Sequence, residues 1–266
     1  MANTHACTPD GGGASLHLLR GSRCAALVVL AALATTDAAY TQTFTLHPRD
    51  LLGGEPEAFV AALEAVRPAP LSAEDIGLIL RMLPPTGEVT DLRSQAQRKV
   101  GLVWQLLAAT RRDWYQVKVI DVPQAVVALH ARSVVLISAP ALAVLNGAEL
   151  QALAAHEIGH EYLWARYERA RRDADRESLK ELELLCDAIA IVTLRKLGMN
   201  PSRLIDGIEK IGQYNRERLG TATNESDYPT VAERRTFVQQ IVRWSSPLAV
   251  SGPAAFAGNT GRKDLR

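Results

Sequence analysis

The sequence of 266 residues has few cysteines, almost no net charge and, after residue 39, no long hydrophobic run. The three cysteines are Cys7, Cys24 and Cys186, too few for a disulfide framework or a cysteine-rich metal site. A net charge of +1 gives no strongly basic surface, so nucleic acid is not an expected partner. No later segment offers the roughly 20 apolar residues that a transmembrane helix needs.

The overall composition is that of an ordinary globular protein. Apolar residues make up 47% of the chain and charged residues 22%, so a sizeable hydrophobic core can form. A length of 266 residues fits one large domain or two small ones, and length alone does not choose between them.

The leader, residues 1–39, has the three parts of a secretory signal peptide. Arg20 and Arg23 supply a positive flank, a short apolar run follows, and small residues end the segment. The apolar run is shorter than the roughly 20 residues that a helix needs to cross a bilayer. We therefore predict export to a bacterial periplasm. The alternative is an uncleaved leader that anchors the protein to a membrane, peripherally or through residues 24–36.

The rest of the sequence contains many helical patterns and two β-rich runs. Ser72 is expected to cap a helix, and Gly198 with Pro201 is expected to end one. His130 is expected in a loop before the second strand. Few strands and many helices, segregated along the sequence, predict an α+β fold. The predicted helices cover about 55–66, 72–80, 90–111, 148–172, 182–198, 202–219 and 229–243, and the predicted strands cover 115–122 and 133–139.

Three regions are expected after the leader. Residues 40–90, of which 40–70 are rich in Pro, Gly and Ala, are predicted to be a helical and irregular segment, and residues 91–245 are predicted to form the main domain. Within that domain, the charged run 169–181 is expected to be a helix end and a loop. Residues 246–266, with scattered Gly, Pro, Lys and Arg, are expected to form a flexible tail.

The stretch AAHEIGHEYLW, residues 154–164, has two histidines four positions apart and a glutamate directly after the first. On a helix these positions share a face, so His156 and His160 can present imidazole nitrogens to one ion. Zinc suits imidazole ligands and keeps an open position when it is catalytic. Glu157 is placed to take a proton from a metal-bound water without binding the metal.

The alternative interpretation is a polar stripe on an ordinary helix, because the pattern His-Glu-x-x-His also arises by chance. A chance match is expected more often on a solvent-exposed, charged face of a helix. Here the neighbouring residues are apolar, and two histidines with a glutamate are costly to bury without partners. The context therefore favours a metal site.

A third protein ligand is then needed, because two histidines alone bind zinc poorly. Glu183 and Asp187 lie four positions apart in an otherwise apolar segment, far enough beyond His160 for a loop and an antiparallel helix. We expect Glu183 to bind the metal and Asp187 to form a hydrogen bond with a ligand histidine. Glu181 is a competing ligand, but it lacks a second acid four residues later. The other interpretation, a plain surface pair of acids, is disfavoured by the apolar neighbours.

The two motifs together resemble those of the M48 family of gluzincin zinc metallopeptidases, the Ste24-like and HtpX-like proteases. The segments AELQALAAHEIGHEY and ELLCDAIAI are the most similar, and SVVLISAPALAVLNG follows the family's order of a β run before the active-site helix. The resemblance covers about residues 115–243. It implies a zincin-like fold, mainly helical with a small β-sheet beside the active-site helix.

The resemblance also implies a role for each motif residue. The residues that would bind one zinc ion are His156, His160 and Glu183. Glu157 would be the general base, and Asp187 would form a hydrogen bond with one of the zinc-binding histidines.

One family element is altered in this sequence. The family usually has Ser/Thr-His-Pro followed by an arginine, and that histidine faces the reacting carbonyl. The stretch SDYPTVAERR keeps Pro229 and Arg234 but has Tyr228 in place of the histidine, and the resemblance implies Tyr228 and Arg234 as further catalytic residues. A tyrosine hydroxyl can donate to a developing oxyanion, so Tyr228 either keeps this role or only packs. The Asn-Ala pair common before the family's β run is also altered, to Ala125-Val126.

We therefore predict an exported zinc metalloendopeptidase that hydrolyses unfolded or loop segments of polypeptides. The strand at 133–139 is expected to pair with an extended substrate along its edge. Because Tyr228 departs from the family pattern, the alternative is a zinc-binding chaperone-like or quality-control protein with weak or lost proteolysis. The sequence leaves the oligomeric state open.

Overall fold

The computed structural model describes four stretches of the chain, residues 47–83, 87–220, 228–248 and 250. The predictions that lie outside the described residues are the signal peptide at 1–39, the anchor through 24–36 and most of the tail at 246–266. Within the described stretches, no helix combines the length and the hydrophobicity needed to span a membrane.

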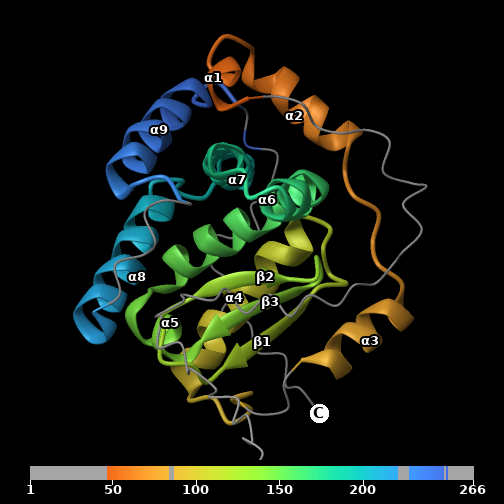
Figure 1. Cartoon of the computed structure of the whole chain (residues 1–266), viewed down its shortest axis with the longest axis vertical. Coiled ribbons are helices and arrows are strands. Elements are labelled where there is room, and N and C mark those ends of the chain that lie inside the picture. The colour runs from red at the N-terminus through yellow and green to blue at the C-terminus, as the bar shows by residue number, and fades with distance from the viewer. Residues whose placement is uncertain (1–46, 84–86, 221–227, 249, 251–266) are drawn as a thin grey trace, which may run out of the picture.

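Helices surround a three-stranded sheet, and the predicted mainly helical α+β architecture is confirmed (Figure 1). The N-terminal helices are α1 (Pro48–Leu51), α2 (Pro56–Ala65), α3 (Ala73–Met82) and α4 (Ser94–Ala109). The strands β1 (Gln116–Ile120), β2 (Val127–His130) and β3 (Val134–Ser138) lead into α5 (Ala139–Val144). The remaining helices are α6 (Gly147–Arg172), α7 (Arg176–Lys196), α8 (Arg203–Leu219) and α9 (Val231–Trp244). In Figure 1, α6 lies between the sheet and α7, and α8 and α9 lie along one side.

β3 is the central strand of the sheet, which has the order β1-β3-β2. It pairs in parallel with β1 and antiparallel with β2. Every residue of β3 is buried, because α3 covers one face through Ile79 and the main core covers the other. The prediction that strand 133–139 pairs with substrate is therefore wrong, because both of its edges are already paired. The outer edges of the sheet belong to β1 and β2, and residues 88–89 already bond to part of β1.

The sequence does not predict three of the elements, α1, β2 and α5, and it misplaces one boundary. β2 ends at His130, so this residue lies in a strand rather than a loop; four residues are too few to show a clear alternation. α5 directly follows β3 and is capped by Ser138, whose Oγ accepts from the Ala141 N–H. Most of the charged run 169–181 is helical, because Glu, Lys and Arg favour helices and Asp175 caps α7 early.

Two predicted helix ends are confirmed. The Ser72 hydroxyl accepts a hydrogen bond of 3.0 Å from the Asp75 N–H at the start of α3. Gly198 follows the end of α7 with a φ of +70°, the left-handed conformation that glycine adopts most easily. α6 begins with reciprocal hydrogen bonds between Asn146 and Glu149, which fix the start of the helix that contains both motif histidines.

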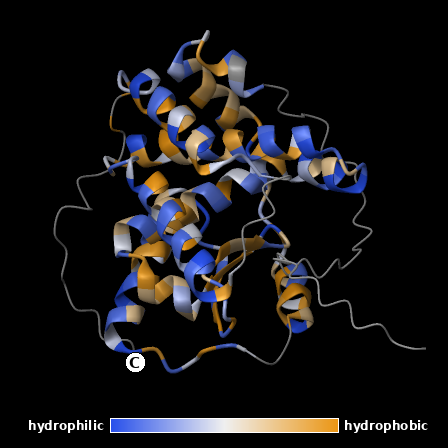
Figure 2. Cartoon of the chain, turned by 60° about the vertical axis from the view of Figure 1, so that its left-hand side comes forward, coloured by the Kyte–Doolittle hydropathy of each residue, from blue (hydrophilic) through white to orange (hydrophobic). Residues whose placement is uncertain are grey.

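The close contact between α6 and α7 forms the centre of the molecule. Gly159 faces Cys186 so closely that a Cβ atom on the glycine would lie 2.7 Å from the Cys186 Cα. Glycine is therefore the residue that allows the two backbones to approach. Hydrophobic residues line the strands and the inner sides of the helices around this contact (Figure 2).

Gly159→Ala is expected to destabilise the fold, because the added methyl group would overlap with the Cα and Cβ of Cys186. Overpacking of this kind typically lowers the free energy of unfolding by about 1–3 kcal/mol. Gly101→Ala in α4 is the matched control, since no described atom lies within 4 Å of the position that its methyl group would take. It should raise stability by about 0.5–1 kcal/mol through better helix propensity. Chemical denaturation measures both, and equal effects would contradict the close approach of α6 and α7.

Candidate metal centre

The facing sides of α6 and α7 bring the two sequence motifs together. The helices run antiparallel, so His156 meets Asp187 and His160 meets Glu183, one turn apart on each helix. The Nε2 atom of His156 lies 3.4 Å from Oε2 of Glu183, and the Nε2 atom of His160 lies 3.6 Å from Oε1. Two imidazole nitrogens and one carboxylate therefore face a common point.

Glu181, the competing acid of the sequence, is directed elsewhere. Its Oε2 lies 2.8 Å from Nδ1 of His47, at the start of α1. The structure thus brings Glu183 to the two motif histidines and uses Glu181 to join the N-terminal segment to α7.

Behind His156, Asp187 and Arg234 form a buried pair. The Nδ1 atom of His156 lies 2.9 Å from Oδ1 of Asp187, whose Oδ2 accepts a 2.9 Å hydrogen bond from Nε of Arg234. Arg234 reaches this place because reciprocal hydrogen bonds between Thr230 and Glu233 start α9 just before it. The guanidinium charge offsets the carboxylate charge that would otherwise be buried uncompensated.

A second set of ligand atoms overlaps with the first. His156, His160 and Cys186 have potential ligand atoms within 4.8 Å of one another, and this buried cluster could hold a metal ion. Cys186 was not predicted from the sequence as part of the site. The available signal was its position directly before Asp187, on the helix expected to return beside the histidines.

The protonation states distinguish the two acidic candidates. Burial raises the pKa of the Cys186 thiol well above its ordinary value, and the charge of Glu183 raises it further. Burial would also raise the pKa of Glu183, but the charges and hydrogen bond of the two histidines lower it to about 2. A metal ion would have to displace a firmly held proton from Cys186, whereas Glu183 is already a carboxylate.

The two histidines differ in their affinity for protons. Burial would lower the pKa of His156, but hydrogen bonds to Asp187 and Glu183 raise it to about 10. Burial lowers the pKa of His160 to about 4. His160 therefore offers a neutral imidazole nitrogen at pH 7, and a metal ion bound at His156 would replace its Nε2 proton.

Glu157 lies beside the histidines and is held by the sheet. Its Oε2 accepts a 2.7 Å hydrogen bond from the Leu129 N–H of β2. Burial raises the pKa of Glu157 to about 7, although the charge of His156 acts to lower it. A carboxylate with a pKa near neutrality can both accept and return a proton, as a general base and acid must.

Tyr228 lies at the solvent-exposed rim of the site, together with Tyr167 of α6. Burial raises the pKa of Tyr228, as does the charge of Glu183, while a hydrogen bond from Tyr167 lowers it. The Tyr167 ring packs edge to face on His160, with ring centres 5.1 Å apart. Tyr167 was not predicted from the sequence, although its position two helical turns after His160 places it on the same face.

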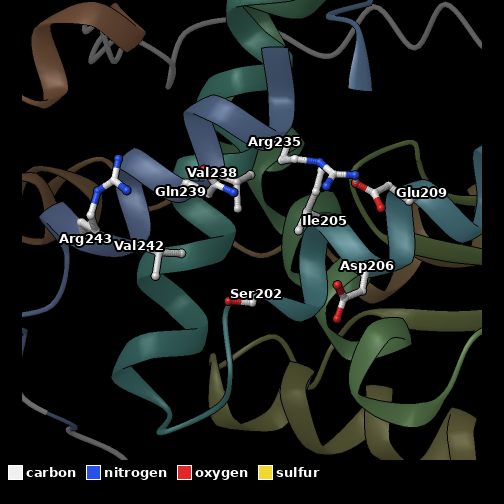
Figure 3. A pocket seen from close by; sticks show the side chains of 9 residues that line it. All are labelled: Ser202, Ile205, Asp206, Glu209, Arg235, Val238, Gln239, Val242 and Arg243. Atoms are coloured by element: carbon white, nitrogen blue, oxygen red, sulfur yellow. Dashed lines mark hydrogen bonds and ion pairs between the residues drawn. The ribbon is translucent and has the colours of Figure 1, made fainter. Parts of the chain in front are cut away.

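Two surface hollows lie away from this site. A groove of about 400 Å³ runs between α8 and α9, where Arg235 and Glu209 point toward each other (Figure 3). A second hollow of about 390 Å³ lies on α9 around Phe237. Neither is lined by the residues of the metal centre, which are mostly buried. His160 is 14% exposed and Tyr228 is 37% exposed, so the site is most open on their side.

Comparison with protein-family models and with curated proteins finds no match for this chain. Its function is therefore inferred from the geometry and chemistry of the site itself.

Proposed function

We propose that this chain is a zinc-dependent endopeptidase with a zincin-like fold, in which His156, His160 and Glu183 bind one zinc ion. The observation that supports it most strongly is the distance of each histidine nitrogen from the Glu183 carboxylate, 3.4 Å from His156 Nε2 to Oε2 and 3.6 Å from His160 Nε2 to Oε1. Ligands about 2.0–2.2 Å from a tetrahedral zinc ion lie roughly 3.3–3.6 Å from one another. The contact of His156 with Asp187 is the kind of support that metal-binding histidines usually have.

The same residues suit the hydrolysis of a peptide bond. Zinc bound between them would lower the pKa of a water molecule and polarise a carbonyl group. Glu157 takes the proton from the water and delivers it to the leaving amine. The Leu129 N–H holds Oε2 of Glu157, so Oε1 is the oxygen that handles the proton. Arg234 fixes Asp187, which in turn holds the His156 ring in place.

The outer edge of β2 is the proposed place for the substrate, in place of β3. β2 is an edge strand, and its Leu129 directly contacts the proposed general base. An extended peptide can add to such an edge through backbone hydrogen bonds, which requires an unfolded or loop segment. Polypeptides without stable structure are therefore the proposed substrate class.

Tyr228→Phe is expected to lower turnover by roughly 10²–10³-fold, the usual effect of losing one oxyanion donor. Tyr167 donates its hydrogen bond to Tyr228, so the Tyr228 hydroxyl retains its own proton for the substrate. Zinc content and melting temperature should not change, because phenylalanine keeps the packing of the ring. Tyr228→His should restore the family donor and retain activity. A Phe variant as active as wild type would exclude the oxyanion role.

The second candidate function is a zinc-binding chaperone-like or quality-control protein with weak or lost hydrolysis. Tyr228 in place of the family histidine favours it. Turnover of an unfolded protein by zinc-loaded wild type separates the two functions, because the second candidate binds the protein without cleaving it. Export to the periplasm, or anchoring through residues 24–36, stays a prediction that the mass of the mature N-terminus would test.

A further inference from the structure

Just before β2, Asn215 of α8 occupies the backbone of Ala125, which continues the outer edge of the strand. Its Oδ1 accepts a 2.8 Å hydrogen bond from the Ala125 N–H, and its Nδ2 donates a 3.0 Å hydrogen bond to the Ala125 carbonyl. Both residues are buried, at 7% and 1% exposed. The side-chain amide thus makes the two hydrogen bonds to Ala125 that the backbone of a neighbouring strand would make.

Ala125 is on the same edge as the residues that would contact a substrate. The Val126 carbonyl accepts from the Ser138 N–H, so Val126 is bonded toward β3. In an antiparallel pair these bonds alternate along the strand, so Val127 and Leu129 direct their N–H and C=O groups away from β3. The Leu129 N–H donates to Glu157, which agrees with this alternation. Val127 therefore lies between Leu129, which contacts Glu157, and Ala125, which contacts Asn215.

We propose that Asn215 limits the length of peptide that can pair with β2, and that it is a specificity-determining residue. The inference rests on the proposed function, because it takes β2 as the edge that binds the substrate. A strand advances about 3.3 Å per residue, so a peptide whose reacting bond lies near Leu129 meets Asn215 about four residues further on. In this proposal the peptide pairs with the backbone of Val127, and the Asn215 side chain blocks pairing at Ala125. Antiparallel pairing, which is slightly more stable, places the C-terminal side of the peptide toward Asn215.

The competing explanation is that Asn215 only satisfies two buried backbone groups. In that case its removal would weaken the fold and lower activity on all substrates equally. A length limit instead predicts that the effect of the substitution depends on the number of residues after the cleaved bond.

The test is a series of peptides lengthened one residue at a time on the C-terminal side. For wild type, kcat/KM should increase with peptide length until the peptide pairs with Val127. It should then stay level, because further residues meet Asn215. For Asn215→Ala, it should increase again, by roughly two- to tenfold, as the freed Ala125 gains a hydrogen bond. Asn215→Ser is the second variant in case the alanine form does not fold. Gln213→Ala is the matched control, because the Gln213 side chain bonds to Glu217 on the surface of the same helix.

The same series is used to measure peptide affinity for the zinc-loaded Glu157→Gln chain. An equal loss at every length, or a plateau that is unchanged in both Asn215 variants, would overturn the proposal. If wild type cleaves no peptide but the affinities show a length limit that Asn215→Ala removes, the endopeptidase proposal fails and the length limit stands. If cleavage occurs without any change in the length profile, the endopeptidase proposal stands and the role of Asn215 fails.

Discussion

Glu157→Gln is expected to lose nearly all hydrolysis while it keeps its zinc ion and its fold. Glutamine preserves the shape of the side chain, and its carbonyl oxygen can still accept the Leu129 N–H. The amide cannot accept the proton of the attacking water. Loss of a general base typically lowers the rate by about 10²–10⁴-fold. Turnover of an unfolded protein, zinc content and melting temperature are measured on the same preparation.

Glu161→Gln is the matched control, because it makes the same change one helical turn away on α6. Glu161 is buried and accepts a 2.7 Å hydrogen bond from Nε of Arg112, so it plays no part in the metal centre. This substitution should lower stability, since it leaves the buried Arg112 charge without its partner. Turnover per bound zinc should stay close to that of wild type. If Glu157→Gln turns over normally, or both variants lose activity equally, the proposed role of Glu157 is contradicted.

Glu183→Ala is expected to lose the metal ion, because two histidines cannot form a stable zinc site. The carboxylate faces both Nε2 atoms, so its removal takes away the third ligand that is already ionised. Glu181→Ala, two positions away, removes the contact with His47 and a charge near Arg166 but no group of the metal centre, and should keep zinc. Metal analysis after dialysis measures both variants.

Cys186→Ala provides the opposing test for the third ligand. The ligand atoms of Cys186 and the two histidines are also close enough for a metal ion, but the thiol holds its proton firmly. We expect this variant to retain zinc. Retention of zinc by Glu183→Ala together with its loss from Cys186→Ala would replace Glu183 with Cys186 in the ligand set.

The parts of the site that the sequence predicts are those that depend on local helical spacing. His156 and His160 lie four apart, as do Glu183 and Asp187, and each pair shares one face of its helix whatever the rest of the chain does. The antiparallel return of α7 then brings the two faces together. The resemblance places Arg234 among the catalytic residues, and the structure shows that it contacts Asp187 behind His156.

The parts that the sequence does not predict depend on contacts between distant segments. β2 is short, and a single sequence does not show that β3 lies between β1 and β2. The edge strand was therefore misassigned to 133–139. Asn215 contacts Ala125 across 90 positions of sequence, and no local pattern marks an asparagine on an amphipathic helix as the partner of a strand. Tyr167 was missed because an aromatic residue at helical spacing usually belongs to a core.

Removal and return of zinc test the central claim most directly. The wild-type chain is stripped with a chelator, zinc is added back in steps, and cleavage of an unfolded protein is followed together with bound metal. We expect cleavage to disappear with the metal and to return in proportion to zinc bound at a single site. Cleavage that persists in the stripped chain, or no cleavage when that site is full, would contradict the claim.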